Sequence, residues 1–220
     1  MECIYCKESC TKKGLQQNGK QKYRCRSCFK YQQSMYTYKA YAPDLDRQVA
    51  RLLKRGSGIR DIAFVKEIST TTVMRRIRAI AEDITPPVPL PPNGDYEMDE
   101  MHTCVWAGNR RSDTYVAYAI HIQERTVVNF TVGGRDATTL GYTVERILRN
   151  RPKSIRTDRW AAYPCIVPKD IHISTRRKIN RIERANHTLR TRLKRVSHNR
   201  LCQSKDIRML AACLKIYFWG

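Results

Sequence analysis

Two Cys-x-x-Cys pairs near the start of the chain limit most strongly what this sequence can fold into. Cys3 and Cys6 form the first pair, and Cys25 and Cys28 form the second after eighteen intervening residues. Two residues between thiolates let a tight turn present both sulfurs to one tetrahedral zinc ion, and two such turns complete the ligand shell. The segment has few aliphatic residues, so its folding depends on a metal. We therefore predict a zinc ribbon over residues 1–40 with one structural zinc ion.

Other residues of this ribbon leave alternatives open. Free surface thiols are the alternative to a zinc site, and Cys10 is either a spare thiol or a ligand in place of Cys6. Cations alternate with aromatic residues around the second pair, which suits either phosphate contact or a solvated ribbon face. The candidate DNA contacts of the ribbon are Lys22, Arg24 and Arg26.

The chain is strongly basic, with 42 Lys and Arg against 20 Asp and Glu among 220 residues and a formal net charge of +22. Release of counterions from phosphates rewards Lys and Arg clusters, so this charge predicts DNA as a partner rather than a basic protein without a specific anion. No apolar run approaches about 18 residues, and the start has no apolar signal core. We expect no membrane contact and a cytoplasmic protein associated with chromosomal DNA.

Residues 43–84 have the apolar spacing of three helices. Gly56, Ser57 and Gly58 end the first helix, and Ser69 can cap the third, whose apolar residues recur every three or four positions. This pattern predicts a helix-turn-helix that lays one face of its third helix in the major groove of DNA, although a three-helix bundle without a DNA role has the same pattern. That outer face comprises Thr71, Thr72, Arg75, Arg76 and Arg78.

A proline-rich stretch separates these modules from the rest of the chain. Residues 85–94 hold five of the nine prolines, which predicts a stiff linker. From residue 95 to 220, strand and helix patterns alternate, as in an α/β domain. The expected elements are strands from 95, at 115–120, 127–132 and 154–158, a crossover helix at 138–150, and a helix at 205–219 that covers the sheet or forms a dimer surface.

Three acidic residues stand out within this basic domain. Asp99 lies on the first strand, with Glu97 on the same face, and Asp158 ends the fourth. A right-handed crossover brings the fourth strand parallel to the first, so the two aspartates come close together. Two neighbouring carboxylates repel, which favours a divalent cation between them. Glu183 is the one acid in a helical segment at 176–195 with nine cations, and we expect it to supply a third ligand.

Each acid also has an ordinary interpretation. Asp99 would be a strand-end cap, Asp158 a turn residue and Glu183 half of an ion pair along a helix. The order Asp, Asp, Glu on strand, strand and helix favours the metal site.

With these features, the chain resembles the insertion-sequence-one family of DDE transposases, whose catalytic core is ribonuclease-H-like. The resemblance covers the cysteine ribbon, the helix-turn-helix and three catalytic signatures, with 24 residues between the second acid and the glutamate. Those signatures are Glu97-Met98-Asp99-Glu100, Thr157-Asp158-Arg159-Trp160 with Tyr163, and Arg181-Ile182-Glu183-Arg184-Ala185-Asn186 with Leu189-Arg190. Arg159 stands where the family often has glycine and Ala185 where it commonly has histidine, and whether His187 substitutes is left open.

The resemblance implies an α/β fold with a ribonuclease-H-like mixed sheet over residues 95–220. It implies that Asp99, Asp158 and Glu183 bind two magnesium ions, with manganese as an alternative, for phosphoryl transfer on DNA. The implied partners are the terminal inverted repeats of an insertion sequence, target DNA and further copies of the chain in a homodimer or larger assembly. The expected DNA contacts of this domain are Trp160, Arg181, Arg184 and Arg190.

Two other functions fit the same modules. A DNA-binding regulator would keep the ribbon and helix-turn-helix and tolerate Asp99→Asn. A metal-dependent nuclease would cut DNA without joining strands.

Overall fold

The computed structural model describes residues 1–35, 38–87, 92–108, 110–175, 179–196 and 203–220. The chain divides into two compact units, residues 1–45 and 46–220. Residues 88–91 of the expected linker and 176–178 of the expected last basic helix lie outside the described residues.

The first unit is a three-stranded antiparallel sheet in the order β1-β2-β3. Its strands are β1 (Cys10–Leu15), β2 (Gln21–Cys25) and β3 (Tyr31–Gln33), followed by the short 3-10 helix η1 (Lys39–Tyr41). The buried Gln32 side chain accepts a hydrogen bond from the Ile4 amide (2.8 Å) and donates to the Glu2 carbonyl (2.7 Å). These two bonds fasten the first cysteine turn to β3, because a buried side-chain amide needs both kinds of partner.

Three helices open the second unit, as the sequence predicts. They are α1 (Leu45–Lys54), α2 (Ile59–Lys66) and α3 (Thr70–Asp83). Gly56 has φ +92° in the turn after α1, and a Cβ there would lie 3.0 Å from the carbonyl oxygen of Arg192, so the turn requires glycine. Ser69 caps α3 by accepting from the Thr72 amide at 3.1 Å.

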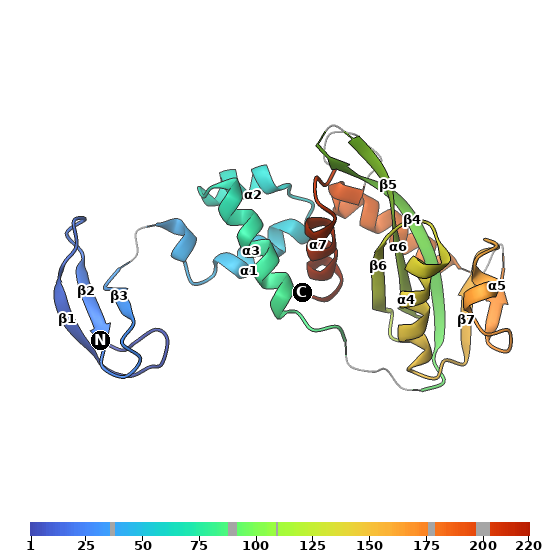
Figure 1. Ribbon diagram of the computed structural model, residues 1–220, viewed down its shortest axis with the longest axis horizontal. Coiled ribbons are helices and arrows are strands. Elements are labelled where there is room, and N and C mark those ends of the chain that lie inside the picture. The colour runs from blue at the N-terminus through green and yellow to red at the C-terminus, as the bar shows by residue number, and fades with distance from the viewer. Residues whose placement is uncertain (36–37, 88–91, 109, 176–178, 197–202) are drawn as a thin grey trace. The chain divides into compact units, whose positions relative to one another are not determined.

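A mixed five-stranded sheet forms the centre of the second unit, in the order β6-β5-β4-β7-β8 (Figure 1). Its strands are β4 (Asp95–Ala107), β5 (Arg110–His121), β6 (Thr126–Gly133), β7 (Ser154–Thr157) and β8 (His172–Ser174). β4 is antiparallel to β5 and parallel to β7. The helix α4 (Ala137–Leu148) connects β6 to β7, and its first turn is capped by Asp136. This architecture confirms the predicted ribonuclease-H-like fold class.

Helices cover both faces of this sheet. α4 packs on the face that carries Tyr96 and Met98, together with the short helix α5 (Tyr163–Ile166). α6 (Asn180–Arg192) contacts the opposite face, to which Glu97 and Asp99 point, and is followed by the 3-10 helix η2 (Lys194–Val196). The predicted alternation along the first strand is therefore confirmed.

The helix α7 (Ile207–Trp219) has two partners within the second unit. It contacts both α3 and β6, and the Trp219 indole donates to the Val127 carbonyl at 2.7 Å. Most of its apolar side chains are buried, Leu210 and Leu214 completely. The helix thus covers the sheet edge and also fixes the helix-turn-helix to it. Among the described residues, none of the helices is both long and apolar enough to cross a bilayer.

Candidate active site

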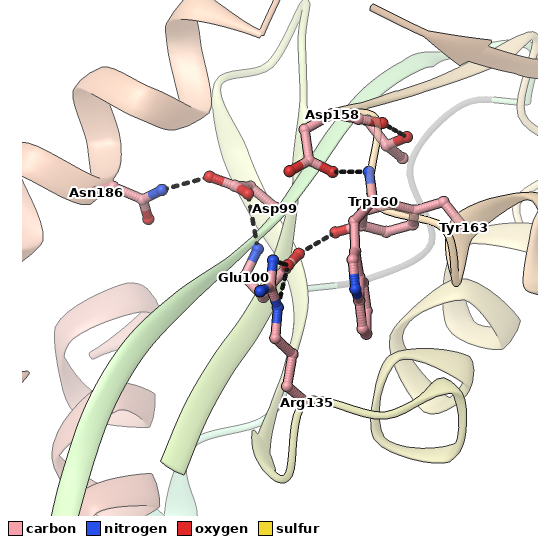
Figure 2. Close-up of polar contacts among 8 residues, drawn as sticks. Asp99, Glu100, Arg135, Asp158, Trp160, Tyr163 and Asn186 are labelled. Carbon is pink, nitrogen blue, oxygen red and sulfur yellow. Dashed lines mark hydrogen bonds and ion pairs between the residues drawn. The ribbon is translucent and has the colours of Figure 1, made fainter. Parts of the chain in front are cut away.

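The parallel pairing of β4 with β7 places the first two predicted catalytic acids next to each other. Glu97 is in register with Arg156, so the same register two positions further along aligns Asp99 with Asp158. β7 ends at Thr157, and Asp158 therefore stands at its carboxyl end beside the middle of β4 (Figure 2). The crossover argument from the sequence is confirmed for this pair of strands.

Among the described residues, the hydrogen-bond donors to Asp99 are neutral. The Asn186 amide donates to Oδ2 at 2.7 Å, and the backbone N–H of Glu100 donates to Oδ1 at 2.9 Å (Figure 2). Burial, the Glu100 charge and the Asp158 charge together raise the pKa of Asp99 to about 7, against the lowering effect of these two hydrogen bonds. A positive charge at this position would offset that repulsion.

Asp158 and Glu183 line one cavity of about 470 Å³, together with Arg159, Thr175 and Ile179. The backbone N–H of Trp160 donates to Asp158 Oδ1 at 2.9 Å and orients that carboxylate. Glu183 lies in the first turn of α6 and is exposed. The cavity is thus bordered by two of the three predicted acids, from different elements.

The three acids do not converge as tightly as the ribbon cysteines do. In the part of the chain that the structure describes, the one group of three or more His, Cys, Asp or Glu side chains placed to share a metal ion is the four-cysteine cluster. Asp158 is the common neighbour, beside Asp99 on the sheet and beside Glu183 in the cavity. The arrangement therefore joins the acids in two pairs.

Glu97 anchors the start of α6. Its Oε2 accepts from the backbone N–H groups of Arg181 (3.0 Å) and Ile182 (2.9 Å), and the residue is only 3% exposed. Residue Ile179, at the cap position, supplies no side-chain hydrogen bond. The Glu97 carboxylate on β4 thus caps α6 from outside the helix, and its negative charge is favourable at the helix N-terminus. It holds the turn that carries Glu183.

Sequence reasoning missed the role of Glu100. Only 2% of its side chain is exposed, and it accepts from the Tyr163 hydroxyl at 2.6 Å and from Arg135 at 2.6 and 3.0 Å (Figure 2). The Arg135 guanidinium also lies over the Trp160 ring, 4.8 Å from its centroid. Burial and the Glu100 charge raise the pKa of Tyr163. The acidic run on β4 was visible in the sequence, but the partners of Glu100 lie far along the chain, in the loop before α4 and in the short helix α5.

The predicted DNA contacts of the catalytic region lie in different environments. Trp160 is half-buried against the core, with Arg135 on its face and Tyr163 at its edge. Arg181 is exposed, but its guanidinium donates to the carbonyl of Ile122. Arg184 and Arg190 are exposed on α6. The arginines are accessible to phosphates, whereas much of the Trp160 ring is already covered.

The four cysteines of the ribbon form a compact cluster. Their sulfurs lie within 4.8 Å of one another, with 3.6 Å between Cys3 and Cys28 and 3.4 Å between Cys6 and Cys25. Cys10 is not one of these four, and burial and the neighbouring Cys3 and Cys25 raise the pKa of its thiol. Burial acts to raise the pKa of Cys25, but the backbone N–H groups of Cys28 and Ser27 lower it to about 6. The arrangement fits a tetrahedral zinc ion held by thiolates.

The predicted cations of the ribbon stack on exposed aromatic rings. Lys22 lies 4.2 Å from the centroid of Tyr31, and Arg24 lies 5.1 Å from that of Phe29. Arg26 is exposed beside the second cysteine pair. The rings hold the charges in place on one sheet.

The predicted outer face of α3 needs correction. Thr72 is only 8% exposed, because it faces the capping turn and its hydroxyl lies 2.8 Å from that of Ser69. Arg76 is half-buried and pairs with Asp46 at 3.4 Å, and Arg78 pairs with Asp206 at 3.4 Å. Thr71 and Arg75 are exposed, as predicted.

Comparisons with known proteins identify the family of this chain. The family model described as IS1 transposase matches residues 95–218, which is more than half of the chain. The chain belongs to the IS1 transposase family. It is 31% identical over 111 residues to the insertion element iso-IS1n protein InsB of Shigella dysenteriae, covering 50% of this chain and 83% of that protein. It is also 32% identical over 65 residues to the iso-IS1N protein InsA of the same organism, covering 30% of this chain and 72% of InsA.

Among solved structures, the chain is similar to the HTLV-2 integrase catalytic core domain in complex with magnesium. The TM-score is 0.34 at 16% identity, covering 59% of this chain and 86% of that one.

Two departures of this IS1-family chain lie close to the acids. Arg159 is exposed and lines the cavity of Asp158 and Glu183, so it narrows that space and adds a positive charge. His187 is exposed one helical turn after Glu183, on the same side of α6, whereas Ala185 is half-buried.

Proposed function

We propose that this protein is a transposase that binds the terminal inverted repeats of an insertion sequence and catalyses metal-dependent DNA cleavage and strand transfer. The observation that carries the proposal is the alignment of Asp99 with Asp158 across two parallel strands, in the region that matches the family. Glu183 borders the same cavity as Asp158. Asp158 is thus paired with Asp99 on the sheet and with Glu183 at the cavity, in a chain of net charge +22.

These acids fit a pair of divalent ions. An all-carboxylate set favours hard cations such as magnesium, with manganese as an alternative. Two ions sharing a site do not require all three acids at one centre, which agrees with the pairwise arrangement. When bound, such ions activate the attacking oxygen and stabilise the leaving oxygen of an in-line displacement. Asp99, Asp158 and Glu183 would hold them.

The surrounding residues keep these carboxylates in position. Asn186 orients Asp99 from α6, and the Trp160 backbone orients Asp158. Glu97 fixes the first turn of α6 and thereby the position of Glu183. Preorganised ligands of this kind reduce the reorganisation needed during reaction. The exposed arginines of α6 supply the charge that holds the DNA strand.

The remaining modules supply recognition. The four-cysteine ribbon, with one zinc ion, and the helix-turn-helix bind the element ends, where Thr71, Arg75, Lys22, Arg24 and Arg26 contact DNA. Joining two ends of one element requires at least two copies of the chain.

The test uses the protein with magnesium and a labelled duplex carrying the inverted repeats that flank its gene. Asp158→Asn should lower cleavage and joining at least about a thousandfold, since metal-ion stabilisation is worth several kcal/mol. DNA binding should change less than about twofold, because phosphate contacts by cations are untouched. Asp170→Asn, an exposed acid before β8, is the matched control and should retain activity.

Each rival gives a different result in this assay. Full joining by Asp158→Asn would contradict the assignment of the acids and leave a DNA-binding regulator. Cleavage without joining by the unmodified protein would instead indicate a nuclease.

A further inference from the structure

A second cleft in the unit of residues 46–220 carries an unusual concentration of positive charge. Its volume is about 850 Å³, and its walls come from the end of α1, the β5–β6 turn, α6 and α7. Six of the lining side chains are cationic and none is acidic. The cations are Lys54, Arg55, Arg125, Arg181, Arg184 and Arg192.

This cleft is separate from the cavity of the catalytic acids. Arg181, Arg184, Thr188 and Arg192 recur every three or four residues and so form one stripe along α6. Glu183 is not part of that stripe and borders the other cavity. The two openings therefore flank the same helix on different sides.

The positive charge of the cleft is not neutralised within the described part of the chain. No ion pair there involves Arg55, Arg125 or Arg184. Arg181 donates to the carbonyl of Ile122, which is a neutral partner, and Lys54 donates to a main-chain oxygen of Gly220. A concave surface lined by one sign of charge focuses the field and attracts a polyanion.

The shape of the cleft favours a nucleic-acid backbone over a small anion. Arg55, Arg125 and Arg184 are long, exposed side chains spread over three elements, whereas a site for one phosphate gathers its donors around a point. Tyr217 and Phe218 form an apolar part of the wall without an acid to repel phosphates. Exposed arginines in a row are typical of sequence-independent contact with DNA phosphates.

We infer that this cleft is a groove that binds the phosphate backbone of duplex DNA. The end of α1 and the helix α6 both contact that backbone. The inference rests on the proposed function and extends it, because the groove lies on the flank of α6 away from the acids. DNA held there contacts the helix-turn-helix and the sheet domain simultaneously. It would therefore orient the DNA approaching the catalytic cavity without contributing a ligand to it.

The test measures the salt dependence of DNA binding without any divalent metal. Fluorescence anisotropy of a labelled random-sequence duplex gives the Kd of the full chain across NaCl concentrations. Each lost phosphate contact reduces the slope of log K against log salt by about 0.9. The double variant Arg125→Ala with Arg184→Ala should have a slope that is shallower by about 1.8. Raising NaCl from about 50 to 200 mM should therefore weaken DNA binding by a factor that is roughly 12 times smaller for the variant than for the parent.

Two further variants separate charge in the cleft from charge in general. Arg149→Ala with Lys169→Ala removes the same charge at exposed positions outside the cleft and should leave the slope within about 0.3 of the parent. Arg125→Lys with Arg184→Lys should restore most of the slope, since phosphate contacts need only the charge. Unchanged thermal unfolding of each variant confirms its fold.

The proposal would be contradicted by an unchanged slope in the Arg125/Arg184 alanine variant. It would also be contradicted if the slope changed equally in the Arg149/Lys169 variant. Neither result depends on cleavage, so the groove and the catalytic assignment can fail separately.

Discussion

Asp99 and Glu100 are consecutive acids on β4 with opposite environments. Glu100 has a cationic partner in Arg135 and a hydroxyl donor in Tyr163, which compensate for its burial. Within the described ranges, Asp99 accepts hydrogen bonds from an amide and a backbone N–H, and its burial and the neighbouring Glu100 and Asp158 charges raise its pKa to about 7. The Glu100 carboxylate is thus compensated by protein groups, whereas the Asp99 carboxylate still favours a cation. Of these two adjacent acids, Glu100 therefore has a structural role and Asp99 remains available to bind a metal ion.

At the scale of one hydroxyl, Tyr163→Phe should destabilise the fold by about 1.5–3 kcal/mol, because it removes a hydrogen bond to a buried carboxylate. Urea unfolding measures the loss. Tyr142→Phe changes an exposed tyrosine of α4 in the same way and should cost less than about 0.5 kcal/mol. Equal stability of the two variants would show that the Tyr163 hydroxyl does not hold Glu100.

Single residues also show where sequence reasoning stopped. Asp99 and Asp158 could be identified because strand alternation and the crossover rule act over short, regular stretches. Glu100 could not, since its partners are Arg135, in the loop between β6 and α4, and Tyr163, in the four-residue helix α5, which is too short to show periodicity. Thr72 was misplaced because helical spacing does not reveal that a residue faces the capping turn.

Among the elements, α6 depends on a neighbour for its first turn. Its capping interaction comes from Glu97 on β4 rather than from its own flanking sequence. The sequence alone therefore gave no start signal, and the predicted segment began at residue 176 rather than at Asn180. β8 and α5 were also missed, because elements of three and four residues carry too little pattern to recognise.

Substitution of Glu97 tests this capping directly. Glu97→Ala should destabilise the protein by about 1–3 kcal/mol and speed amide hydrogen exchange at Arg181 and Ile182, because both N–H groups lose their acceptor. Glu97→Gln retains an acceptor oxygen and should preserve most of that protection. Glu124→Ala, at an exposed turn, is the control. Slow exchange of both amides in Glu97→Ala would contradict the anchoring role.

On the scale of the whole molecule, the two units are stabilised differently. Within residues 1–40, the described buried hydrophobic side chains are Cys3, Cys25 and Ala40, whereas the second unit has an extensive aliphatic core. A segment with so little apolar burial cannot offset its conformational entropy without a cross-link. We therefore expect a metal held by the four cysteines to determine whether the ribbon folds.

Zinc removal should consequently unfold only the ribbon. A chelator should expose residues 1–35 to proteolysis, while residues 46–220 keep their cooperative thermal transition. Elemental analysis should find one zinc per chain. Cys25→Ser should lose that zinc and Cys10→Ser should retain it, because Cys10 lies outside the cluster. Loss of zinc from Cys10→Ser alone would contradict the ligand set.

The position of α7 has a consequence for biosynthesis. Its two partners, α3 and β6, both emerge from the ribosome well before residues 207–219 have been translated. Until then the apolar surfaces of α3 and β6 that this helix contacts are exposed, which favours chaperone binding to the nascent chain or mispairing within it. The second unit therefore reaches its final arrangement late in synthesis, when α7 packs against α3 and β6 together.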